Sequence, residues 1–94
     1  MRTSYNEYMV RIWVKIMQGE KIVRQYVYEK EELLVWSHFF VYVSELCAEL
    51  DIPTPVVVKT HIFNFAKFRN VRFLPRDFVE EVDFDKLVLE NLSV

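Results

Sequence analysis

The chain has 94 residues, enough for one small domain and too few for two independent cores. Its composition of 52% hydrophobic, 16% aromatic and 28% charged residues excludes disorder over most of the length. The net charge of −2 argues against a polybasic nucleic-acid binder. We therefore expect a single domain over residues 1–94, with any flexibility confined to residues 1–8.

Two β-rich runs near the N-terminus predict an antiparallel hairpin. Residues 9–17 alternate with a period of two, and residues 22–28 resume a strand pattern at hairpin distance. One side of the first strand carries only β-branched residues: Val10, Ile12, Val14 and Ile16. In the second strand we expect Val23 and Val27 to face the core.

Residues 31–50 predict one long helix that crosses the sheet. Acidic residues at its start favour the positive end of the helix dipole, and Pro53 and Pro55 end it. Apolar residues recur in steps of three and four along the face expected to lie on the sheet: Leu33, Trp36, Phe40, Val43, Cys47 and Leu50.

The C-terminal half predicts shorter elements. In chain order they are a strand at 56–58, a helix capped by Thr60 and ending at 67 or 69, a strand at 71–74, a turn or a single helical turn at 75–80 and a strand at 87–92. Phe73, Phe78 and Phe84 are expected to pin the irregular parts onto the core. The order β-β-α-β-α-β-β indicates an α+β fold, in which a small antiparallel sheet of the hairpin and the C-terminal strands packs on one long helix.

One stretch of the chain is locally basic despite the overall negative charge. Residues 52–76 contain no acid, and their cations form a candidate contact for an anion or a nucleic acid: Lys59, Lys67, Arg69, Arg72 and Arg76. Phenylalanines lie among them, and single strands bind to cations beside stacking aromatics. Phenylalanines in a small domain are more often core residues, so nucleic acid is the less favoured partner.

The sequence contains no constellation that predicts catalysis or a cofactor. A single glycine cannot supply a phosphate-binding loop, and a single cysteine cannot form an internal disulfide. Cys47 belongs to the apolar helix face, and His38 is expected on the surface. A small hydrolase or metal enzyme would need His61 to converge with carboxylates. Asp83 with Asp85, or Glu81 with Asp83, offers only a weak divalent-cation site. We expect no catalytic residue, metal or cofactor.

The length of the apolar runs and the number of cysteines predict the cellular location of the protein. No apolar run approaches the roughly twenty residues that span a bilayer. The lone cysteine fits a reducing compartment. We expect a soluble cytoplasmic protein without a membrane partner.

Several segments of the C-terminal half resemble a family of short uncharacterised bacterial proteins found chiefly in anaerobic Gram-positive organisms. The segments are residues 50–55 (LDIPTP), 65–69 (FAKFR), 72–73 (RF) and 78–85 (FVEEVDFD), together with the pattern of the N-terminal hairpin. The resemblance implies a bacterial cytoplasmic domain and implies nothing about catalysis.

The leading functional hypothesis is a non-catalytic protein-interaction or assembly module. Beside the predicted core face of the long helix, a second stripe predicts a homodimer interface: Leu34, Ser37, Val41, Ser44 and Ala48. The alternatives are that the helix from Thr60 packs on this stripe within the chain, or that the stripe is plain surface. The partner would be a second copy or another protein, and binding of an anion or nucleic acid at residues 59–76 is the competing function.

Overall fold

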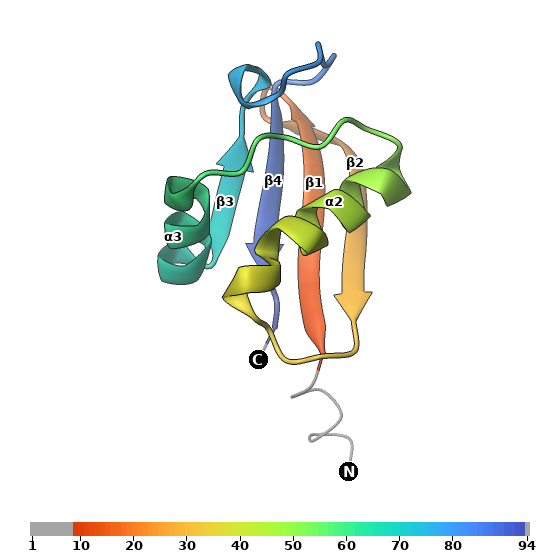
Figure 1. Cartoon of the computed structure of the whole chain (residues 1–94). Coiled ribbons are helices and arrows are strands. Elements are labelled where there is room, and N and C mark those ends of the chain that lie inside the picture. Colours follow the sequence, from red (N-terminus) through yellow and green to blue (C-terminus); the bar gives the residue numbers. More distant parts are fainter. Residues whose placement is uncertain (1–8, 94) are drawn as a thin grey trace.

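The structure, a computed structural model that describes residues 9–93, contains a four-stranded antiparallel sheet with a helix across one face (Figure 1). The strand order is β2-β1-β4-β3. The strands are β1 (Val10–Gln18), β2 (Lys21–Lys30), β3 (Asn70–Phe73) and β4 (Lys86–Asn91). This arrangement confirms the predicted α+β class, with the hairpin beside the C-terminal strands. Residues 1–8, where flexibility was predicted, lie outside the described residues.

The alternating pattern of β1 forms the centre of the core as predicted. Its β-branched side chains are buried, and those of Ile12 and Val14 are fully so. In the register with β4, Val14 lies opposite Leu89 and Ile16 opposite Leu87, so neighbouring strands present apolar side chains to the same side. Burial of these pairs against α2 (Phe39–Leu50) holds the two layers together.

The prediction for the buried side of β2 is wrong. Val23 and Val27 are exposed at 47% and 46%, whereas Tyr28 is buried. The register with β1 explains this, because Val27 lies opposite Trp13 on the open face of the sheet and Tyr28 lies opposite Ile12 on the helix side. A register shift beside Val23 leaves that residue without a partner in β1, as in a β-bulge.

The long helix predicted over residues 31–50 is shorter in the structure. A 3-10 turn, η1 (Trp36–His38), leads directly into α2. Val35 is extended, with φ −122° and ψ 118°, so the acidic residues expected in the first turn lie before the helix. The helix ends where the sequence predicts, at Asp51, which adopts the left-handed conformation with φ 58°.

The buried side of α2 is also different from the predicted one. The sheet covers Phe39, Tyr42, Val43, Leu46, Cys47 and Leu50. The C-terminal half of the predicted stripe is therefore correct, but Leu33, Trp36 and Phe40 are exposed at 56%, 40% and 55%. Residues 39–43 are apolar at every position, so the sequence periodicity fits more than one face.

Residues 56–58 do not form the predicted strand. The Val56 N–H donates to the Asp77 carbonyl at 2.8 Å, which ties this connecting segment to the 3-10 turn η2 (Pro75–Asp77). Among the described residues, the order of strands and α-helices is therefore β-β-α-α-β-β.

The second α-helix, α3 (Lys59–Phe68), lies at the predicted position beside β3 (Figure 1). It begins after Val58, whose N–H donates to Nδ1 of His61 at 3.0 Å. The N-cap residue is therefore Val58 and not Thr60, which lies inside the first turn. Neither α-helix within residues 9–93 is long and apolar enough to cross a membrane.

The phenylalanines of the C-terminal segment anchor it as predicted. Phe73 is fully buried, and Phe78 and Phe84 are nearly so. The rings of Phe78 and Phe84 meet edge to face with centroids 5.5 Å apart. The irregular chain between β3 and β4 is therefore held by aromatic packing.

Candidate interaction surface

The side of α2 that faces away from the sheet has exposed apolar residues in its first half, whereas its second half also exposes Glu45 and Glu49. Phe40 is exposed at 55%, Val41 at 41% and Trp36, in the preceding turn, at 40%. We define the α2 outer face by the uncharged side chains on this surface: Trp36, Ser37, Phe40, Val41, Ser44 and Ala48. A continuous exposed apolar surface is a feature of protein contact sites.

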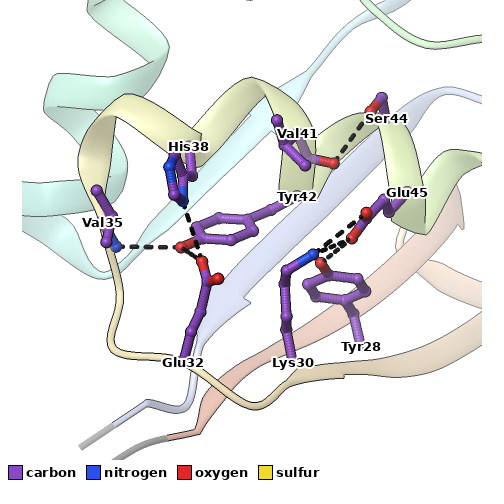
Figure 2. Close-up of polar contacts among 9 residues, drawn as sticks. All are labelled: Tyr28, Lys30, Glu32, Val35, His38, Val41, Tyr42, Ser44 and Glu45. Atoms are coloured by element: carbon purple, nitrogen blue, oxygen red, sulfur yellow. Dashed lines mark hydrogen bonds and ion pairs between the residues drawn. The ribbon is translucent and has the colours of Figure 1, made fainter.

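Most of the predicted dimer stripe lies on this face. Ser37, Val41 and Ala48 are exposed, and Ser44 is half-buried, with its Oγ donating to the Val41 carbonyl at 3.0 Å (Figure 2). Leu34 is separate, because it precedes η1 and packs against the core.

The aromatic members of the α2 outer face are the ones that sequence reasoning assigned to the core. A spacing of four residues links Trp36 and Phe40 to two members of the predicted stripe, Ser44 and Ala48. Phe40 and Ser44, four residues apart within α2, are neighbours on the helix surface, so this spacing was the available signal.

Helix α3 does not cover the α2 outer face. Its residue Phe65 is fully buried and packs on Phe39, with ring centroids 5.1 Å apart, and on Trp36 at 6.1 Å. These contacts hold α3 beside the N-terminal end of α2, where it leaves Phe40 and Val41 exposed. The packing of α3 onto the predicted stripe is therefore not what the structure shows.

A polar network fixes the start of α2 (Figure 2). The hydroxyl of Tyr42 donates to Glu32 Oε2 at 2.6 Å and accepts the Val35 N–H at 3.1 Å. His38 Nδ1 lies 3.2 Å from the same carboxylate oxygen. Because Tyr42 is fully buried, these bonds connect the core to the segment before the helix.

A second set of polar contacts fixes the middle of α2 to the edge strand (Figure 2). The Tyr28 hydroxyl donates to Glu45 Oε1 at 2.5 Å, and Lys30 Nζ lies 3.2 and 3.3 Å from the two carboxylate oxygens of Glu45. The Tyr28 and Tyr42 rings are 6.1 Å apart, so the two sets are adjacent. Together they hold the helix in one position with its outer face presented to solvent.

The network alters the acidity of its members. Hydrogen bonds from Tyr42 and then His38 hold the pKa of Glu32 below its ordinary value, and bonds from Tyr28 and then Lys30 do the same for Glu45. Burial, reinforced by the bond to Glu32, raises the pKa of Tyr42 to about 12. The contacts are therefore strongest between ionised carboxylates and neutral phenols.

The cations of the predicted anion site are placed on different parts of the molecule. Lys59 and Lys67 lie on α3, and Arg76 lies in η2. Arg72 pairs with Val88, on the open face of the sheet. The Arg69 guanidinium donates to the carbonyls of Asn91 and Ser93, at 3.1 and 2.7 Å, and so serves the fold.

Among the described residues, His61 has the surroundings that most resemble those of a catalytic group. It borders a cavity of about 320 Å³ and is nine-tenths buried, and its Nε2 lies 3.8 Å from Asp77 Oδ2. Its Nδ1 accepts the Val58 N–H, so the neutral ring carries its proton on Nε2. Neither nitrogen then has a free lone pair to accept a proton or bind a metal. The pairing of His61 with a carboxylate is therefore real, but the site is not equipped for general-base chemistry.

The remaining candidate groups show no reactive arrangement. Burial raises the pKa of the Cys47 thiol to about 12, which leaves it unreactive near neutrality. Asp85 accepts the Gly19 N–H at 2.5 Å and so serves the hairpin turn. Asp51, Glu81 and Asp83 line an open groove of about 620 Å³. Within residues 9–93 no group of three or more His, Cys, Asp and Glu side chains could hold a metal ion.

Comparisons with known proteins add no relative: no family model, curated protein or solved structure matches the chain.

Proposed function

We propose that this protein is a non-catalytic assembly module that forms a homodimer through the α2 outer face. The observation that carries the proposal is the exposure of Phe40 and Val41 on the side of α2 that the sheet and α3 leave uncovered. Trp36, in the preceding turn, is 40% exposed beside them and packs on Phe65 of α3. Burying such a surface against another protein releases water from apolar area, which is the main favourable term in association. A two-fold dimer is the commonest way for a soluble protein to do this.

The other functional hypotheses have less support. Binding of an anion or nucleic acid would use Lys59, Lys67 and Arg72, which the fold distributes over α3 and the open face of the sheet. The single cysteine and the resemblance to short bacterial proteins support the proposal of a bacterial, cytoplasmic setting. A different protein as partner for the same face is an outcome of the test below.

Light scattering and sedimentation of the full chain at micromolar concentration test the proposal. We expect the mass of two chains for the wild type and of one chain for Val41→Glu and Ala48→Arg, because a charge would be buried without a partner. Val27→Glu, which places the same charge on the open face of the sheet, is the matched control and should remain a dimer. A wild-type mass of one chain would overturn the homodimer and leave a different protein as the occupant.

The competing function is tested by retention on immobilised single-stranded nucleic acid. The proposal predicts no retention at physiological salt. Retention that falls steeply with added salt, and that is lost in a variant with Lys59 and Lys67 replaced by glutamate, would favour nucleic-acid binding instead.

A further inference from the structure

We draw no further inference here: the strongest candidate, the exposed face of α3 on which Lys67 Nζ lies 5.5 Å from the ring centroids of both Phe63 and Phe68, carries none because nothing within residues 9–93 shows what covers it.

Discussion

In the first turn of α2, over residues 39–43, the inner and outer sides are both apolar but lie in opposite environments. Phe39 is fully buried between the sheet and Phe65, while its neighbour Phe40 is exposed at 55%. The apolar content of a helix therefore does not reveal how much of it the same chain will cover. What the chain leaves uncovered is the surface most available to a partner.

The largest expected effect is a difference in the free energy of unfolding between variants of these two adjacent phenylalanines. Phe39→Ala should lower the free energy of unfolding by about 3–5 kcal/mol, because it leaves a cavity against Phe65. Phe40→Ala should cost less than about 1 kcal/mol at concentrations where the chain is monomeric. Urea unfolding of both variants measures the difference, and equal losses would show that Phe40 is also part of the core.

A smaller effect is expected at the polar edge of the inner side. Tyr42→Phe keeps the buried ring but removes the hydroxyl that serves Val35 and Glu32, and it should cost about 1–3 kcal/mol. Tyr26→Phe, on the same side of β2, is the control, because the Tyr26 hydroxyl has no hydrogen bond to residues 9–93. A similar loss in both variants would argue that the Tyr42 network adds nothing beyond ring packing.

The smallest expected effect is a change in how stability depends on acid pH, through the carboxylates that bind the tyrosines beneath α2. Glu32 and Glu45 have folded pKa values below the ordinary 4.5, so each stabilises the fold fully above that value. This stabilisation is lost as the pH falls through the lower folded pKa. Unfolding free energies measured from about pH 6 to pH 3 should therefore fall less steeply in Glu45→Gln than in the wild type.

The matched control for the acid series is Glu20→Gln. Glu20 is exposed in the turn between β1 and β2 and makes no hydrogen bond to a tyrosine of residues 9–93. If it flattened the acid dependence as much as Glu45→Gln, the tyrosine–carboxylate bonds would not be its cause.

The sequence by itself determined the elements whose signals are local. The period of two in β1 identified its buried side, because successive side chains of a strand must point to opposite faces. The prolines after residue 51 identified the end of α2, and Phe73, Phe78 and Phe84 were correctly expected in the core. The first two features follow from backbone geometry. The third follows because these phenylalanines lie in largely polar stretches, so each is the aromatic side chain of its segment that the core can bury.

Tertiary structure alone decided between sides that are equally apolar. Tyr28 faces the core instead of Val27 because the register with β1 places it there, and Phe39 is buried instead of Phe40 because the sheet and Phe65 reach only that side of α2. The approach of His61 to Asp77 likewise depends on the packing of distant segments. Burial is a property of contacts between segments far apart in the chain, so no local period can specify which of two apolar sides will be covered.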